Sequence, residues 1–494
     1  MMRKYLWFIS FFAIVVAGLM PSCLREQAAS LDGAYPNPVA KIILNKCAVA
    51  GCHTAADKDL AAGLNLSTWR DCFKGTADHE SVVIPYYSME SHLFMHCNTY
   101  ADLGEQLIPR MPKADAALSR EELKILDNWI MQGAPDKYGR LPFSDRPSRS
   151  KIYVTNQGCD RVAVIDANSR LLMRYIQVGT SSGVEGPHKV SVSRDSRYVY
   201  VLLNNDGVLH KIDAATDEII GSASFGTGNW VNFIISKDGS RAFVLDSEND
   251  GRVVVVNLNT MIDEKYYSGT GLFVLPHGMS LSPDEQYLYV LPSGGNFVYK
   301  MDVTAPLQPQ LPQKVCLVPG SQASFSAADN LNFHEIVFSP DGSKYFVNTQ
   351  LKNDVRVYNA KNDSLLSIIP TAIYPQEFAF SKQYPYLFVS CILDSTCTSA
   401  ACLGAISVID YNSLQLVKNI KEGFYQPHGL VVDDANHRLF VASRNLDIKG
   451  PPPHHKAACI GRNGFISSVN LNDLSLEEYH VDLSVDPYSV AIRR

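Results

Sequence analysis

Residues 333–349 read FHEIVFSPDGSKYFVNT, and this stretch contains the pattern that decides the fold. An apolar run ends in the turn SPDG at residues 339–342, and a strand rich in aromatic residues begins at Tyr345. Proline, aspartate and glycine favour tight reversals, so the stretch predicts two antiparallel strands joined by a short turn. A third strand is predicted to end at Asn359, and a fourth follows it.

The same four-strand unit recurs seven times between residues 151 and 494. Each unit has an inner strand, a turn with serine and aspartate, an aromatic strand, a third strand and a fourth strand. The aromatic strands begin at Ile152, Tyr198, Ala242, Tyr287, Tyr345, Tyr386 and Leu439. The third strands end at Asp166, Asp213, Asn257, Asp302, Asn359, Asp410 and Asn470. Such a repeat is typical of an all-β propeller, here with seven blades.

The order of strands in the repeat predicts how the ring closes. The first unit lacks its inner strand, and the chain ends with an unmatched inner strand at residues 487–492. We expect this last strand to complete the first blade, because closure removes the exposed edge that a linear array would carry.

A YVTN sequence at residues 153–156, together with the Ser-Pro-Asp-Gly turns, resembles the YVTN-repeat family of seven-bladed propellers. That family includes lactonases, amine-dehydrogenase heavy chains and the haem-binding propellers of nitrite reductases. The resemblance therefore implies an architecture for residues 151–494 and leaves the activity open.

Histidines stand at the start of four inner strands, and we expect them to ring one end of the central channel. They are His188, His277, His334 and His428, and the equivalent positions of the other blades hold Val231, Gln376 and Tyr488. A ring of imidazoles is able to bind a metal, a cofactor carboxylate or an anionic substrate. The alternative is that these histidines only form hydrogen bonds across the channel.

A second motif lies before the repeat, at residues 47–53, which read CAVAGCH. It is a lengthened relative of the C-x-x-C-H signature of c-type haem. In that signature two thiols add to the vinyl groups, and the histidine after the second thiol is the proximal iron ligand. The pattern predicts these roles for Cys47, Cys52 and His53, although two cysteines at this spacing also suit a small disulfide or half a zinc site.

Downstream sequence favours haem. The segments GLNL at 63–66, VIP at 83–85, ESHL at 90–93, RMP at 110–112 and WIMQGA at 129–134 follow in order. Ser119 and Glu122 also predict a capping box for a closing helix with one apolar face. The series resembles the planctomycete-type cytochrome c domain, so the resemblance implies a small all-α haem c domain over residues 35–137.

The sixth iron ligand is inferred from the same resemblance. Met111 stands where that family places its distal methionine, and the resemblance implies that it completes the iron coordination. His92, Met95 and His96, on a short helix predicted within residues 88–97, are the alternatives. Methionine opposite histidine raises the reduction potential and suits electron transfer, whereas an open site suits small-ligand chemistry.

The N-terminal residues indicate export. Arg3 and Lys4 precede an apolar stretch that is short for a membrane span, which predicts a signal peptide at residues 1–22. Ser22 before Cys23 resembles a bacterial lipoprotein cleavage site, so we expect lipidation of Cys23 and a periplasmic or cell-envelope location. A net charge of -6 with no basic run gives no footprint for nucleic acid.

Eleven cysteines fit an oxidising compartment. The pairs expected first are Cys72 with Cys97 and Cys397 with Cys402, although spacing alone does not fix connectivity. Two insertions, at residues 391–402 and 450–459, interrupt the blades. The second carries His454 and His455 beside Cys459, and we favour a proline-rich loop held by a disulfide over a metal site.

The sequence therefore predicts a multidomain protein: a haem domain, a linker at residues 138–150 and a propeller. The favoured function is single-haem electron transfer, with the propeller docking a redox partner protein or a small-molecule electron donor or acceptor. One alternative is a periplasmic oxidoreductase whose active site in the channel exchanges electrons with the haem. Another is a non-enzymatic binding or scaffold protein of the envelope, so whether the protein is an enzyme stays open.

Overall fold

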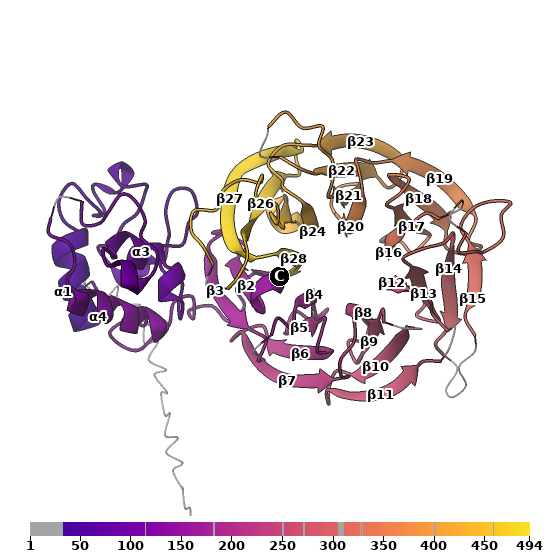
Figure 1. Cartoon of the computed structure of the whole chain (residues 1–494), viewed down its shortest axis with the longest axis horizontal. Helices are drawn as coiled ribbons and strands as arrows, with labels where there is room; N and C mark the ends of the chain where they lie inside the picture. Colours follow the sequence, from indigo (N-terminus) through magenta and orange to yellow (C-terminus); the bar gives the residue numbers. More distant parts are fainter. Residues whose placement is uncertain are drawn as a thin grey trace, which may run out of the picture.

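The computed structural model describes residues 33–494 except 114, 181–182, 249–250, 270–271, 305–310, 327, 329, 400–401 and 458. The predicted signal peptide at residues 1–22 and the lipidation site Cys23 lie outside the described residues. A small helical part precedes a ring of β-sheets (Figure 1). Among the helices that the structure describes, none is long and apolar enough to cross a bilayer.

The described residues before 132 contain four α-helices. They are α1 (Asn37–Ile42), α2 (Trp69–Cys72), α3 (His92–Cys97) and α4 (Arg120–Met131). A π turn, η1 (Ile43–Cys47), continues α1, and there are 3-10 turns at η2 (Lys58–Leu60), η3 (Ser88–Glu90) and η4 (Ala101–Leu103). Residues 138–150, all of them described, contain neither helix nor strand.

Helix α4 confirms the predicted closing helix. The Ser119 hydroxyl accepts a hydrogen bond from the N–H of Glu122, and the Glu122 carboxylate accepts one from the N–H of Ser119, which caps the first turn from both sides. Leu126 and Trp129 face inward, and the Trp129 ring meets Tyr35 edge-on at 6.0 Å between ring centroids. Because α4 buries one apolar face, it anchors the core of the helical part.

The described strands form seven four-stranded sheets. The inner strands are β4 (Pro187–Val192), β8 (Trp230–Ile235), β12 (Pro276–Leu281), β16 (Phe333–Phe338), β20 (Pro375–Phe380), β24 (Pro427–Asp433) and β28 (Pro487–Arg493). The second strands are β1 (Lys151–Asn156), β5 (Tyr198–Leu203), β9 (Arg241–Asp246), β13 (Tyr287–Pro292), β17 (Lys344–Thr349), β21 (Tyr386–Cys391) and β25 (Arg438–Ser443).

The outer half of each sheet faces the rim of the ring. The third strands are β2 (Arg161–Asp166), β6 (Val208–Asp213), β10 (Arg252–Asn257), β14 (Phe297–Asp302), β18 (Asp354–Asn359), β22 (Ala405–Asp410) and β26 (Asn463–Asn470). The outermost strands are β3 (Leu172–Gln177), β7 (Glu218–Ser224), β11 (Ile262–Tyr267), β15 (Gln313–Cys316), β19 (Leu365–Pro370), β23 (Gln415–Ile420) and β27 (Ser475–Val485). The predicted seven-bladed propeller is confirmed.

The last strand closes the ring as predicted, because one sheet has the order β28-β1-β2-β3. Ile492 pairs with Ile152, and Val490 pairs with Val154. The Ser489 N–H also donates a hydrogen bond of 2.9 Å to the hydroxyl of Thr155. Residues from the two ends of the propeller therefore share one blade, with β28 at the inner edge of the ring (Figure 1).

Every third strand ends in the predicted aspartate or asparagine, and each of these side chains accepts a hydrogen bond from the backbone N–H two residues further on. The acceptors are Asp166, Asp213, Asn257, Asp302, Asn359, Asp410 and Asn470. This side-chain bond forms an Asx turn, which reverses the chain into the outermost strand. One residue type at one position therefore sets the same turn in all seven blades.

A β-bulge recurs near the start of every inner strand, where the pairing with the second strand shifts register. In β4, for example, Pro187 pairs with Leu203 while Lys189 pairs with Leu202, so two steps on one strand oppose one on the other. Bulges re-aim side chains and are frequent beside functional sites. Here they lie where the predicted channel histidines stand.

The helical part packs against the first and last blades. Glu90 and Arg161 form an ion pair of 2.6 Å, with 2% and 11% of their side chains exposed. The Ser81 hydroxyl donates to the backbone carbonyl of Leu172 at 2.7 Å, and Ile84 belongs to the apolar core of the propeller. The two parts therefore share buried contacts as well as a chain connection.

Two disulfides form among the described residues. Cys397–Cys402 confirms one prediction, and Cys159–Cys459 ties the 450–459 insertion to the first blade across 300 residues of sequence. The predicted Cys72–Cys97 bridge is wrong, because both thiols are free. Cys72 faces the hydroxyl of Tyr35 instead, and burial raises the pKa of Cys72 to about 12.

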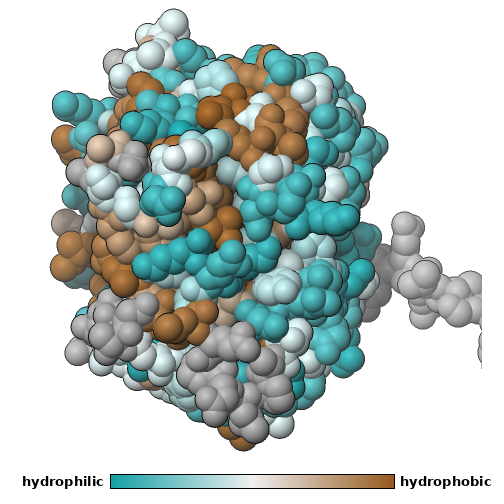
Figure 2. All heavy atoms as spheres, turned by 90° about the vertical axis from the view of Figure 1, so that its right-hand side faces the viewer, coloured by the Kyte–Doolittle hydropathy of each residue, from teal (hydrophilic) through white to brown (hydrophobic). Residues whose placement is uncertain are grey.

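The rim far from the helices carries apolar side chains interspersed with polar ones (Figure 2). The outermost strands supply them in alternation: Leu366 and Ile368 of β19 are 45% and 49% exposed. Scattered apolar side chains are normal on a protein surface. The remaining candidates for a functional site are residues 47–53, where the sequence predicts haem attachment, and the central channel.

Candidate functional site

The predicted haem motif forms a single turn at the end of η1. Cys47 is the last residue of this π turn, and its carbonyl accepts a hydrogen bond of 3.2 Å from the N–H of His53. Gly51 has a φ of +79°, a conformation that glycine adopts without steric cost. This closure brings Cys47, Cys52 and His53 together despite the four residues between the two cysteines.

His53 has the environment of a neutral ligand. Burial lowers the pKa of the ring, and a hydrogen bond to the Leu64 carbonyl offsets part of that effect. Among the described residues, its buried Nδ1 has no hydrogen-bond partner. A neutral imidazole has a nitrogen lone pair available for a metal. Burial therefore favours the uncharged form of the His53 ring.

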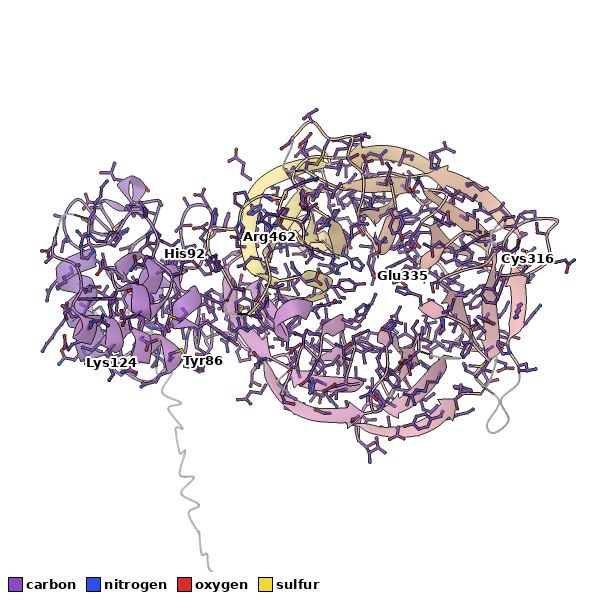
Figure 3. The ribbon with its side chains drawn as sticks, viewed as in Figure 1. Tyr86, His92, Lys124, Cys316, Glu335 and Arg462 are labelled. Atoms are coloured by element: carbon purple, nitrogen blue, oxygen red, sulfur yellow. A yellow bond between two sulfur atoms is a disulfide. The ribbon has the colours of Figure 1, made fainter. Side chains whose placement is uncertain are left out.

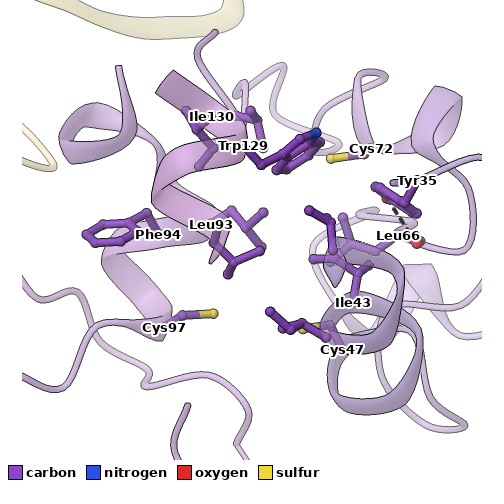
Figure 4. Packing of buried hydrophobic residues seen from close by; sticks show 14 of the residues in the cluster. Tyr35, Ile43, Cys47, Leu66, Cys72, Leu93, Phe94, Cys97, Trp129 and Ile130 are labelled. Atoms are coloured by element: carbon purple, nitrogen blue, oxygen red, sulfur yellow. Dashed lines mark hydrogen bonds between the residues drawn. The ribbon is translucent and has the colours of Figure 1, made fainter. Parts of the chain in front are cut away.

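The two cysteines of the motif are free thiols in different surroundings. Cys52 is partly exposed, whereas Cys47 is buried in the helical core (Figure 4). A hydrogen bond from the Cys97 thiol lowers the pKa of Cys47, and the same bond raises the pKa of Cys97. Sequence analysis missed this contact, because Cys97 reaches Cys47 only through the packing of α3 against η1.

The residues predicted as sixth ligands gather beside α3. The Met111 N–H donates to the carbonyl of His96 at 2.8 Å, and the Met111 side chain packs against the same apolar cluster as Cys47. His96 also holds this segment through its Nδ1, 2.8 Å from the Pro109 carbonyl. Protonation of His96 would lower the pKa of His53.

The other two alternatives are engaged elsewhere. His92 Nδ1 lies 3.4 Å from the Glu80 carboxylate at the junction with the propeller (Figure 3), and Met95 is fully buried. Of the two methionines, Met111 packs against the apolar cluster that contains Cys47, and Met95 is not part of that cluster.

The four predicted channel histidines do form part of one ring, at the bulged starts of β4, β12, β16 and β24. Ring centroids are 4.4 Å apart between His277 and His334 and 5.4 Å apart between His334 and His428. Tyr488 of β28 stacks on His428 at 3.7 Å and lies 4.4 Å from His188. The aromatic side chains therefore form a continuous layer across the channel.

Three of the four histidines in this layer lie within hydrogen-bond distance of a partner through Nδ1. His188 Nδ1 lies 2.7 Å from the Gln157 amide, His277 Nδ1 lies 3.1 Å from the His334 carbonyl, and His428 Nδ1 lies 3.2 Å from the Tyr488 carbonyl. In the part of the chain that is described, His334 Nδ1 and His428 Nε2 are buried without a partner. The hydrogen-bonding interpretation is thus incomplete for these two histidines.

A charged layer lies next to the histidines. Lys189 Nζ is 3.0 Å from the Glu377 carboxylate and 3.4 Å from that of Glu335, which Figure 3 shows beside the central opening. Burial alone would lower the pKa of Lys189, but the two carboxylates raise it above its usual value. Burial raises the pKa of Glu335 to about 7. Sequence analysis missed this layer, because regular alternation places the residue after each ring position, whether His188, His334 or Gln376, on the opposite face.

The glycines in two Pro-His-Gly sequences explain why only some blades carry these charges. A Cβ on Gly278 would lie 2.6 Å from the His334 carbonyl oxygen, and one on Gly429 would lie 2.4 Å from that of Tyr488. Neighbouring inner strands therefore approach too closely there for any side chain.

Beyond the charged layer, a cavity of about 410 Å³ is lined by residues of β4, β8, β12 and β16, including Lys189 and Glu335.

These features define the chain as a seven-bladed β-propeller with a helical N-terminal part. No protein-family model matches the chain, and no curated protein sequence does. Gluconolactonase PpgL, a periplasmic protein of Pseudomonas aeruginosa, is 15% identical with a TM-score of 0.50, over 70% of this chain and 99% of its own. At this identity the likeness concerns the fold alone.

Two further solved structures are similar at lower scores. Hydrazine synthase of Kuenenia stuttgartiensis is 15% identical over 63% of this chain and 100% of its own, with a TM-score of 0.42. Dihydro-heme d1 dehydrogenase NirN, in complex with DHE, is 11% identical over 92% of this chain and 98% of its own, with a TM-score of 0.47.

Proposed function

We propose that the protein is an exported c-type cytochrome that transfers single electrons through one haem in its helical part. The observation that supports this most directly is the closed turn of residues 47–53, which groups two free thiols with a half-buried histidine. The unpartnered Nδ1 of His53 is the kind of buried polar atom that a bound group would explain.

Four residues would hold the haem. Cys47 and Cys52 would each add their S–H across one vinyl group, forming a thioether without a leaving group, and His53 would bind the iron from one side. Met111 would bind it from the other side, where its segment is fixed to His96. When bound, the haem supplies reversible one-electron chemistry.

Cys47 must turn away from Cys97 for attachment. In the structure its thiol contacts Cys97 instead, which lowers the pKa of Cys47. Cys97 then stays as a buried thiol.

The disulfides support export. Cys159–Cys459 and Cys397–Cys402 are bonds that persist in oxidising compartments and are rare in the cytoplasm. We propose that residues 1–22 direct export and that Cys23 is lipidated, which would hold the protein at the cell envelope. The propeller would then dock a redox partner protein or a small-molecule electron donor or acceptor.

Peptide mapping tests the haem proposal. The protein is expressed with c-type maturation machinery, digested, and analysed by mass spectrometry, and we expect one haem on the peptide that contains residues 47–53. The variant Cys52→Ser should keep a haem on a single thioether and shift the reduced haemochrome band to longer wavelength, because one vinyl group stays conjugated. Cys72→Ser is the matched control and should change neither. Wild-type peptide without haem would contradict the proposal.

A second candidate is an oxidoreductase with its substrate in the propeller channel. The buried layer of histidines beside Lys189, Glu335 and Glu377 favours it, since such clusters of perturbed titratable groups are typical of active sites. Substrate-dependent reduction of the haem, lost in Glu377→Gln and kept in Met95→Leu, would support this candidate.

A further inference from the structure

We propose that the channel binds one divalent transition-metal ion through His334, His428 and Glu377. Each residue offers one ligand atom, and the three atoms lie within 4.8 Å of one another. They come from the adjacent inner strands β16, β20 and β24, so no local sequence motif contains them. The site shares no residue with the haem motif and goes beyond the electron-transfer function.

The two histidines offer free nitrogens. His334 is 7% exposed and His428 is 1% exposed, yet one ring nitrogen of each has no hydrogen-bond partner among the described residues. The other nitrogen of His428 is oriented by the Tyr488 carbonyl at 3.2 Å. A histidine ligand typically has its second nitrogen fixed in this way, which sets the tautomer and aims the free nitrogen at the metal.

The third ligand is a carboxylate with a fixed neighbour. Lys189 contacts one oxygen of Glu377 at 3.0 Å, which orients the group and leaves its second oxygen for a metal. Lys189 also faces Glu335, so one ammonium group stands between two carboxylates.

The donor set limits the metal. Two imidazoles and one carboxylate suit Zn²⁺ and its first-row neighbours, whereas Mg²⁺ and Ca²⁺ prefer oxygen ligands alone. Three protein ligands leave a position open for water or an anion, as in catalytic rather than structural zinc sites.

The proposed ligand set contains two of the four channel histidines that the sequence predicts. His188 and His277 do not belong to the group of donor atoms that lie within 4.8 Å of one another. We therefore assign neither as a ligand. His277→Gln serves as a matched control, because it removes an imidazole from the same layer and spares the proposed ligands.

Calorimetric titration tests the site. Full-length protein is treated with a chelator and titrated with Zn²⁺, and we expect one equivalent to bind. His428→Gln and Glu377→Gln should each weaken binding by about 100-fold or more, since the effect of losing a ligand is at least that of losing its orienting partner. His277→Gln should bind as the wild type does.

A folding control keeps the test decisive. Each variant is unfolded thermally with and without Zn²⁺, and a folded variant that no longer gains stability from the metal supports the site. Wild-type protein that binds no Zn²⁺ would overturn the inference. Equal affinity in the wild type and in folded His428→Gln and Glu377→Gln would also overturn it, because the metal would then bind elsewhere.

Discussion

Hydrogen bonds in the surrounding segment hold Met111 in place more than the packing of its side chain does. Its N–H bonds to His96, and His96 in turn bonds to the Pro109 carbonyl, so backbone contacts place the sulfur beside the core that contains Cys47. A thioether ligand stabilises reduced iron, which raises the reduction potential. The effect of Met111 on the iron can therefore be measured as a change in reduction potential.

We predict that Met111→Ala lowers the reduction potential by on the order of 0.1 V, a modest part of the roughly 0.8 V that axial ligands span. The methionine-to-iron charge-transfer band should disappear as well. Redox titration followed in the visible range measures both. Met95→Leu, at a fully buried methionine of α3, is the control, and an unchanged band in Met111→Ala would exclude Met111 as a ligand.

At the scale of elements, repeated turn chemistry made the blades predictable. Aspartate or asparagine at the end of each third strand and serine with aspartate after the inner strands are local signals, and they placed the aromatic strands to within one residue. The bulge in each inner strand was not predictable, because it is a shift of register against the second strand of the same blade that the turn residues do not mark. Glu377 was missed for that reason, and Cys97 was missed because tertiary packing alone brings it to Cys47.

The disulfides differ in the length of chain that they close. Cys159–Cys459 spans 300 residues and Cys397–Cys402 spans 5, so the first restricts the unfolded chain far more. We predict that replacing Cys159 and Cys459 by serine lowers the free energy of unfolding by about 5 to 6 kcal/mol, against about 2 kcal/mol for the short bridge. Denaturant unfolding compares the two variants, and equal losses would refute the prediction.

At the scale of the whole molecule, the helical part and the propeller are joined by a pH-dependent contact. His454 of the 450–459 insertion lies 3.0 Å from Glu80, and this carboxylate raises the pKa of His454 to about 9. His454 and His92 together lower the pKa of Glu80. Protonated His454 therefore stabilises the folded state fully below about pH 6.5, and this stabilisation is lost as the pH rises to about 9. The stabilisation that ionised Glu80 gives to the folded state is lost as the pH falls below about 4.5.

We predict that His454→Gln is less stable than the wild type at pH 6 and equal to it above pH 9. The difference should stay below about 1 kcal/mol, because His454 is half-exposed to solvent. Thermal unfolding at a series of pH values measures it. Lys456→Gln is the control, since it removes a nearby positive charge that does not belong to the ion pair. A difference that grows with pH would contradict the ion pair.

The central claim is that one covalent haem c belongs to the helical part of a propeller protein. The most direct test is the visible spectrum of the purified protein, oxidised and reduced, with a pyridine haemochrome assay and a haem stain on a denaturing gel. We predict one haem per chain that stays attached on the gel and is reduced and reoxidised reversibly. Protein matured under the same conditions without covalent haem would contradict the claim and leave a propeller-based binding protein.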